Sequence, residues 1–554
     1  MSTLLTNLNL KKLQSRLDWK LLLFLLLFLN VKLEVKIAAV LIIYLLQADF
    51  RFKFSFKNSR LPLFYPLIMV LAFADFIISK NYSSPNYILV LLMGAGFWLL
   101  CILTIHQVKL CVERNDVEVI HNTILVFFII NAAISLLNLG AIILETHALN
   151  PYTYQGQHQK YFIGTGDYIK GLTFDTSTTN AVLNAFGVVY FFTKKNALML
   201  LVCMAVVLLT GSNFTNIILL LVLVLLFIFK SSRDQKSLVI ICLGFLVVFM
   251  AKISPQNNDY VVETFSNIFH KPNPVINAPA TVLPITLRPD STLNPEQKKE
   301  KIATMYIDSL NAISYRLTQQ HSPAAPQNKP VIKTDAGRIL VPIPNINTEP
   351  YQSLTTTPPE QAQLVGFINT HKALLPVSSR PFHWSPVPGK VTAMQQTVNF
   401  FKTHPAKLIA GDGMGNFSSK LAFKASRLNI SGGYPEKHTY INHDFLVNHL
   451  DLYLNFFSNR AGYHSLTNSP FSVYDQLFAE YGILGFLLFC IYYLGFFTKH
   501  IKALTYGLPI LLLTLAFLCI DYWFEQLSIL IFFELLLLLD IKESAPKLKL
   551  THGY

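Results

Sequence analysis

The chain has 554 residues, of which 52% are hydrophobic and only 14% are charged, and its mean hydropathy is +0.42. Because about a quarter of the residues in an ordinary soluble protein are charged, this composition excludes a soluble multidomain protein and favours a polytopic membrane protein. The formal net charge of +14 arises mainly in short loops between apolar runs, so we expect membrane lipids and no nucleic acid as partners.

Twelve apolar segments are candidates for transmembrane helices, each of which needs roughly 20 apolar residues. The first two are short and form either two spans or a re-entrant hairpin; we favour two spans. The segments are 21–31, 37–46, 61–79, 87–108, 119–144, 181–192, 197–209, 216–230 and 238–253, followed by 483–497, 506–521 and 527–541.

These segments divide the chain into three parts. Residues 1–253 form an N-terminal transmembrane block of about nine spans, and residues 473–554 form a C-terminal block of about three spans with a cytoplasmic tail. Residues 254–472 form a polar insert, in which Pro-rich stretches alternate with segments of helical spacing such as 390–403. We predict that the insert is a set of amphipathic helices lying on the membrane.

The basic loops give the orientation. With twelve spans, the loops rich in Lys and Arg all fall on one face, which the positive-inside rule assigns to the cytoplasm. We therefore predict a multi-pass protein of a bacterial inner membrane, with both termini cytoplasmic and the insert periplasmic. One loop departs from the rule, because Lys32 and Lys36 fall on the predicted periplasmic side.

The sequence indicates no metal centre or cofactor. None of the six cysteines lies in the insert, so we expect neither a disulfide framework nor a cysteine metal site there. Four histidines lie near the end of the insert, at positions 438, 443, 449 and 464, but their spacing matches no metal-ligand motif.

Two polar turns between spans fall on the predicted periplasmic face. Lys170 lies just before a helix that begins with small polar residues, where a cation and a helix N-terminus can hold an anionic group. Ser212 and Asn213 lie in the second turn and are able to donate hydrogen bonds to a ligand. The structural alternatives are an interfacial lysine that anchors the helix and residues that cap the next helix.

Two further features lie at the end of the insert. Gly411, Gly413 and Gly415 form a turn whose exposed backbone can approach a sugar or a phosphate, although this segment alone favours a plain loop. Glu480 precedes a span, where an ionisable group is costly and usually has a function; capping the helix is the structural alternative.

The order of these features resembles the superfamily of O-antigen ligases and polymerases. The similar stretches are HPAKLIAGDGMGNFSS at 404–419, SVYDQLFAEYGILGFLLF at 472–489 and IKGLTFDTSTTNAVLNAF at 169–186. Most of the chain resembles the family in topology, whereas only these stretches resemble it in residues. Lys170 stands where the family usually has Arg, and the family's His-Asn pair is displaced toward His464 and Asn468.

The resemblance implies an all-α membrane glycosyltransferase with a GT-C-like fold and a large periplasmic insert before the last three spans. Its donor is expected to be a glycan on a polyprenyl diphosphate, and its acceptor a lipid A–core sugar, a growing repeat unit or a protein hydroxyl. No nucleotide or metal is expected. The implied catalytic residues are His464 as base, Glu480 and Lys390; the implied substrate-binding residues are Lys170, Ser212, Asn213, Arg380, Gly413, Asn416, Arg460 and Asn468.

Two other functions stay open. A transporter or flippase for lipid-linked glycans also has about twelve spans, and needs polar residues near the middle of the bilayer. Asp75 and Glu534 are the clear acids within apolar segments. The second alternative is a membrane scaffold whose periplasmic insert binds a partner.

Overall fold

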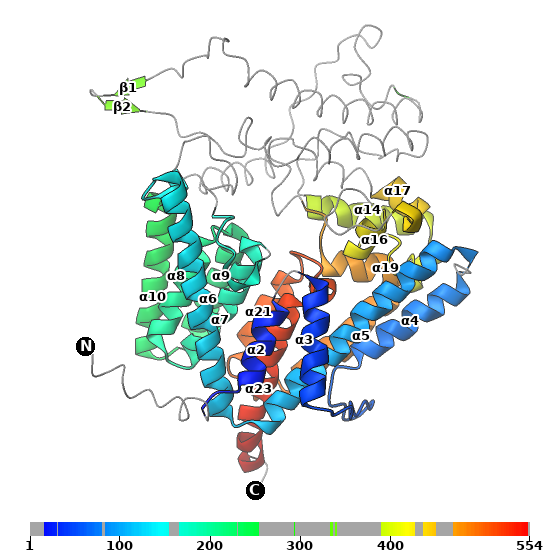
Figure 1. Cartoon of the computed structure of the whole chain (residues 1–554), viewed down its shortest axis with the longest axis horizontal. Coiled ribbons are helices and arrows are strands. Elements are labelled where there is room, and N and C mark those ends of the chain that lie inside the picture. The colour runs from blue at the N-terminus through cyan, green and yellow to red at the C-terminus, as the bar shows by residue number, and fades with distance from the viewer. Residues whose placement is uncertain are drawn as a thin grey trace.

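A computed structural model gives the structure of the chain (Figure 1). It describes residues 16–29, 32–79, 83–153, 166–174, 176–229, 231–253, 293, 333–335, 338–340, 389–426, 436–449 and 469–551. Arg380, Arg460, His464 and Asn468 lie outside the described residues, as does most of the polar insert.

Each of the first nine predicted apolar segments forms a helix. The two longest, α5 and α6, have 30 residues each. The helices are α2 (Trp19–Phe28), α3 (Leu33–Leu46), α4 (Phe64–Ile78), α5 (Pro85–Arg114), α6 (Val117–Thr146), α7 (Ser177–Thr193), α8 (Ala197–Leu209), α9 (Asn213–Phe229) and α10 (Arg233–Val248), and α10 continues into the π-helix η5 (Phe249–Ile253).

The described part of the insert contains short helices, turns and one small hairpin. Strands β1 (Lys333–Asp335) and β2 (Arg338–Leu340) pair antiparallel, with Lys333 opposite Leu340. The predicted helix over 390–403 is confirmed as α14 (Gly389–Thr403). The other described helices of the insert are α15 (Lys407–Ala410), α16 (Lys420–Ser426), α17 (His443–Asn448) and the short 3-10 helix η8 (Glu436–His438). Two further 3-10 helices, η2 (Pro151–Thr153) and η4 (Gly171–Thr173), lie in the N-terminal block.

The last three predicted apolar segments are also helical. The first runs through α19 (Val473–Leu488), the π-helix η9 (Phe489–Leu494) and α20 (Gly495–Thr498), and the second is α21 (Gly507–Phe517). The short α22 (Trp523–Gln526) leads into α23 (Ser528–Thr551), which begins in the middle of the helices in Figure 1. From Ser528 to Asp540 every residue of α23 is buried, so this helix forms the centre of the core.

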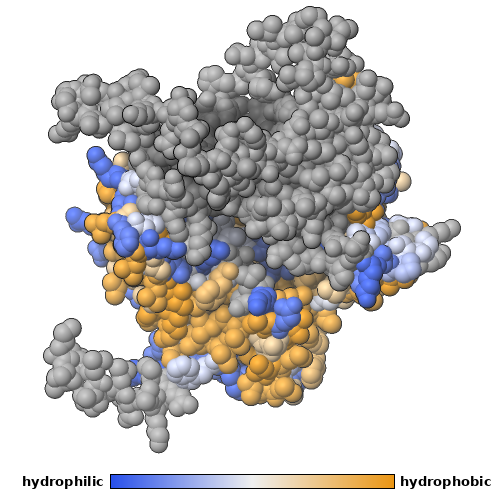
Figure 2. All heavy atoms as spheres, turned by 45° about the horizontal axis from the view of Figure 1, so that its top comes forward, coloured by the Kyte–Doolittle hydropathy of each residue, from blue (hydrophilic) through white to orange (hydrophobic). Residues whose placement is uncertain are grey.

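The surface of the described helices is apolar over a broad area bordered by hydrophilic residues (Figure 2). Leu41, Leu45 and Leu198 are 59%, 85% and 73% exposed, which is costly in water and favourable in lipid. Among the described residues, four helices are long and apolar enough to cross a membrane: Pro85–Arg114, Val117–Thr146, Arg233–Ile253 and Val473–Thr498. The chain is thus a helical protein of a membrane, and twelve spans stay a prediction.

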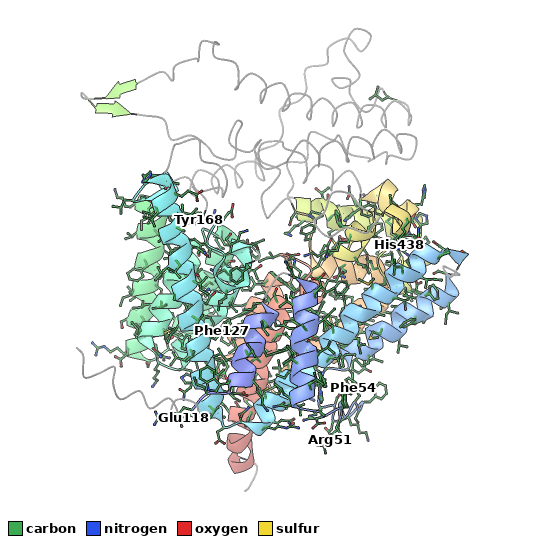
Figure 3. The ribbon with its side chains drawn as sticks, in the orientation of Figure 1. Arg51, Phe54, Glu118, Phe127, Tyr168 and His438 are labelled. Atoms are coloured by element: carbon green, nitrogen blue, oxygen red, sulfur yellow. The ribbon has the colours of Figure 1, made fainter. Side chains whose placement is uncertain are left out.

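The two ends of the helices differ in the loops they carry. Figure 3 places Arg51 and Glu118, from loops predicted to be cytoplasmic, at one end, and Tyr168 and His438 at the other. Ion pairs join distant loops at the first end, with Arg114 to Asp49 at 2.9 Å and Lys194 to Glu543 at 2.6 Å. These four residues therefore lie at the two ends that the alternation of spans assigns to them, and the side of the membrane that each end faces stays a prediction.

The two acids within apolar segments are buried and hydrogen-bonded. Glu534 on α23 accepts hydrogen bonds from the hydroxyl groups of Tyr65 and Tyr493, the second at 2.8 Å. Asp75 on α4 accepts one from Ser79 at 2.9 Å. Each acid thus has a structural partner in the helical core.

Candidate functional site

The glycine turn at the end of the insert has a backbone that only glycine adopts readily. Gly411, Gly413 and Gly415 have φ angles of +85°, +94° and +77°, a region in which a Cβ atom is strained. A Cβ on Gly411 would lie 2.3 Å from the backbone carbon of Glu480, and one on Gly413 would lie 2.6 Å from Oδ2 of Asp75. The turn is therefore packed against α4 and α19 with no room for a side chain.

The backbone of α19 binds this turn directly. The amides of Asp412 and Gly413 donate to the carbonyl oxygens of Ala479 and Glu480, at 2.9 and 3.1 Å. The Glu480 carboxylate, 1% exposed, accepts from the amides of Gly415 at 2.8 Å and Phe417 at 3.2 Å. Two stretches more than 60 residues apart in the sequence thus form one unit, and Glu480 holds the turn in shape.

A second buried carboxylate fixes the other side of the turn. Asp475 on α19 accepts hydrogen bonds from Thr397 at 2.8 Å and Ser418 at 2.7 Å. His449 Nε2 lies 3.8 Å from Asp475 Oδ2, and its ring packs 5.2 Å from that of Phe417. Burial lowers the pKa of His449 to about 3, so this histidine is neutral at physiological pH.

A more open charged group lies at the start of the turn. Lys407 forms ion pairs with Asp412 and, at 2.8 Å, with Asp444 on α17. Burial alone would lower the pKa of Lys407, but the two carboxylates outweigh it and raise that pKa. Burial raises the pKa of Asp412 well above its usual range, whereas the hydrogen bond from Lys407 leaves the pKa of Asp444 lowered. Asp444, whose side chain is 16% exposed, is thus the carboxylate of the group that solvent reaches.

Lys390, at the start of α14, is held by three acceptors. Its ammonium donates to Ser469 Oγ at 3.0 Å, to the carbonyl oxygen of Ile520 at 2.9 Å and to that of Phe471. An ammonium has three donors, so this arrangement leaves none for a ligand. Burial lowers the pKa of Lys390 to about 7. Its position indicates that Lys390 joins α14 to the chain before α19 and to the segment that follows α21.

The Lys170 turn is built on a buried amide network. Asn131 on α6 donates to Asn180 Oδ1 on α7 at 2.9 Å and accepts from the amide of Leu172 at 2.9 Å. Gly171 has φ +58°, and a Cβ there would lie 2.6 Å from Asn131 Oδ1. The Lys170 ammonium, half-buried, has no ion-pair or hydrogen-bond partner among the described residues. The fold therefore presents, among the described residues, a cation without a partner on a turn held by buried amides.

The Ser212–Asn213 turn lies at the same end of the bundle. A Cβ on Gly166 would lie 2.4 Å from the carbonyl oxygen of Leu209, which brings the segment before Lys170 against this turn. Ser212 Oγ forms a hydrogen bond with Thr215 Oγ1 at 2.9 Å. Asn213 Oδ1 is buried without a hydrogen-bond partner in the described structure.

The predicted site residues therefore fall into two groups. Gly413, Asn416 and Glu480 lie at the glycine turn, where Asn416 donates to the carbonyl oxygen of Asp412 at 2.7 Å and accepts from Tyr440 at 3.0 Å. Lys390 lies at the start of α14, against the chain before α19. Lys170, Ser212 and Asn213 lie in the N-terminal bundle. No described contact joins Lys170 to Lys390.

The sequence interpretation missed Lys407 and Asp412. Lys407 and Asp412 lie five residues apart on either side of the Gly411 bend, and a pair of opposite charges across a predicted turn was the available signal. The motif resemblance directed attention to the glycines, although the ion pair between these two residues spans the start of the turn.

No protein-family model, curated protein or solved structure matches this chain in the three comparisons made.

Proposed function

We propose that the protein is a membrane glycosyltransferase that moves a glycan from a polyprenyl diphosphate to a sugar acceptor at the periplasmic face. The acceptor is a lipid A–core sugar or a growing repeat unit, as in an O-antigen ligase or polymerase. The proposal rests on the sequence resemblance, since its substrates are those of the family that the motifs resemble.

The proposed function is supported most by the direct contact between the glycine turn and α19. The two stretches that carry the resemblance bind each other through two backbone hydrogen bonds and the Glu480 carboxylate. A rigid backbone turn beside buried carboxylates suits a site that holds a sugar in one orientation. A sugar held in this way has already lost much of its translational and rotational freedom before the reaction, which lowers the barrier. A mere loop between helices requires no such contacts.

The chemistry needs a cation and a proton acceptor. The diphosphate leaves as the glycosidic bond breaks, and a cation is needed to stabilise the negative charge that develops on it. We assign this role to Lys170, because its ammonium has no partner among the described residues. Of the described carboxylates near the turn, Asp444 is the one whose pKa is lowered, so it is ionised and able to accept a proton from the acceptor hydroxyl. His464 remains the proton acceptor that the resemblance implies.

Deletion of the chain in its host tests the function. We expect lipid-linked glycan units to accumulate on the periplasmic face while polymerised or attached surface glycan disappears. The measurement is the composition of lipid-linked and surface glycan, with accessibility of the lipid-linked units to a periplasmic probe. If the units stay on the cytoplasmic face, the protein is a transporter and the proposal is wrong.

The variant Lys170→Ala tests the residue assignment. Loss of one charge-stabilising donor is expected to lower transfer by about a hundredfold. Lys170→Arg keeps the charge and should retain most activity, and Lys437→Ala is the matched control because that lysine is exposed. Transfer at the normal rate in Lys170→Ala would remove the charge-stabilising role.

A further inference from the structure

A separate pocket lies between the N-terminal hairpin, the insert and the start of the last helix. Leu29, Leu33 and Lys36 come from α2 and α3, and Phe97 from α5. The other lining residues are Lys420 and Lys424 from α16 and Glu525, Gln526 and Ser528 from α22 and α23. None of the nine belongs to the glycine turn or to the Lys170 turn.

The charge of this pocket is strongly unbalanced. Three lysines line it, against one acid. The ammonium groups of Lys420 and Lys424 have no hydrogen-bond or ion-pair partner among the described residues. Burial, and then the neighbouring Lys420, lowers the pKa of Lys424. Two adjacent cations that repel each other in a partly buried place gain stability from an anion.

Glu525 does not supply that anion. Its carboxyl group accepts hydrogen bonds from the amide of Leu421 at 2.8 Å and from the Gln476 side chain. Burial, and then the nearby Glu480, raises the pKa of Glu525 to about 8, so it is mostly protonated at pH 7. Lys420 and Lys424 therefore line the pocket without an ion pair among the described residues, and Glu525 and Glu34 act on Lys424 only at longer range.

An unpaired hydroxyl lies at the same place. Ser528 is 2% exposed, lines the pocket, and its Oγ atom has no hydrogen-bond partner in the described structure. It is the first residue of α23, a helix of 24 residues. A helix N-terminus favours an anion because its first amides and its dipole point toward it. The two lysines, the Ser528 hydroxyl group and the N-terminus of α23 are thus all groups that favour binding of one phosphate group.

We propose that this pocket binds the phosphate group of a membrane lipid. Its apolar wall, made of Leu29, Leu33 and Phe97, would contact the first part of the lipid chain. Helix α3 continues from the pocket with Leu41 and Leu45 exposed, which gives the chain an apolar surface to follow. A free phosphate ion would gain nothing from these contacts.

The pocket also accounts for the loop that departs from the charge rule. Lys36 is 5% exposed and donates to the carbonyl oxygen of Gln526, so this lysine is part of the pocket wall and not a solvated loop residue. This role in the pocket wall explains why Lys36 lies on the predicted periplasmic face, where the other loops are poor in charge. The proposal does not depend on glycan transfer, because binding is measured without it.

Calorimetric titration of the full chain in a non-ionic detergent tests the proposal. The probes are farnesyl diphosphate, farnesol and inorganic pyrophosphate, which separate a lipid-borne phosphate from a neutral lipid and a free anion. Farnesyl diphosphate should bind at least about tenfold more tightly than either of the others, since only it makes both the charged and the apolar contacts. Its affinity should fall as salt rises.

Paired variants locate the site. Lys420→Gln combined with Lys424→Gln should weaken farnesyl diphosphate binding by at least about tenfold. The control combines Lys402→Gln with Lys437→Gln, which removes the same charge from exposed lysines of the insert and should leave binding unchanged. Ser528→Ala, which breaks no hydrogen bond of the described structure, should weaken binding without changing the thermal unfolding midpoint.

Three results would overturn the proposal. Equal affinity for pyrophosphate and farnesyl diphosphate would assign the pocket to a free anion. Unchanged binding in both the lysine pair and Ser528→Ala would place the lipid elsewhere. No binding of farnesyl diphosphate to the folded chain would remove the phosphate site altogether.

Discussion

At the scale of single residues, burial determines what the charged side chains near the turn are able to do. Glu480 and Asp475 are each 1% exposed and accept hydrogen bonds from neighbouring groups of the protein. A buried carboxylate with such partners is costly to remove, because its partners would be left unpaired. Both acids therefore position the glycine turn, whereas Asp444 and Lys407 retain access to solvent and are better suited to meet a substrate.

Lys390 gives a prediction about pH at this scale. Because burial lowers the pKa of Lys390 from 10.5 to about 7, the unfolded state binds the proton more strongly between these two values. Stability should therefore rise with pH by about 1.4 kcal/mol per pH unit above pH 7 and level off near the unfolded pKa. The cost of burying the charge is fully present below pH 7.

The variant Lys390→Met isolates this effect. The thermal unfolding midpoint of each protein is measured in detergent from pH 6 to pH 10, and the difference between them removes the contribution of all other groups. The wild-type protein should gain stability relative to the variant only above pH 7. A difference that stays flat over this range would show that Lys390 keeps an ordinary pKa.

At the scale of elements, Gly482 is the point on which the site depends. It has φ +63° and ψ −163° inside α19, a conformation open essentially to glycine alone. It separates the turn of helix that holds the glycine loop from the apolar turns that follow. This break in the helix brings Gly482 close to the backbone of Ile409 and Gly411. The glycine turn and α19 therefore fit together only with glycine at both position 411 and position 482.

Gly482→Ala tests this fit. The added Cβ would lie 2.5 Å from the carbonyl oxygen of Ile409 and 2.6 Å from the amide nitrogen of Gly411, and the backbone angle adds strain of about 1–3 kcal/mol. We expect a lower thermal unfolding midpoint and faster proteolysis at the glycine turn. Gly96→Ala on α5 is the control, because nothing lies within 4 Å of its Cβ position; an equal effect in both variants would contradict the assigned role of Gly482.

At the scale of the whole molecule, the sequence predicted the helices better than the site. A long apolar run is a local signal, and each predicted segment is helical in the structure. The lengths were less predictable, since α2 has 10 residues and α21 has 11, shorter than a span usually requires. Four helices meet that length and composition in the described residues.

The site could be predicted only in part, because its contacts join distant segments. The motifs indicated Gly413 and Glu480, but nothing local shows that the Glu480 carboxylate binds the amides of Gly415 and Phe417. The lysine pocket shows the same limit, since Lys36 on α3 and Ser528 on α23 lie far apart in the sequence and line one pocket only in the folded chain. The chemistry of a residue can be predicted from its type, whereas its partner depends on the fold.

The orientation of these helices leads to a prediction for the whole chain. Lys57 lies in the strongly basic loop before α4, and Lys437 lies in the insert; both side chains are exposed. If the basic loops face the cytoplasm, Lys437→Cys should react with a membrane-impermeant maleimide in intact spheroplasts, and Lys57→Cys only after the membrane is permeabilised. The unsubstituted chain is the control, since four of its six cysteines are buried and two are partly buried. Labelling of both variants from the same side would contradict the separation of loops between the two ends of the bundle, and would place the lysine pocket and the glycine turn on the wrong face for a periplasmic reaction.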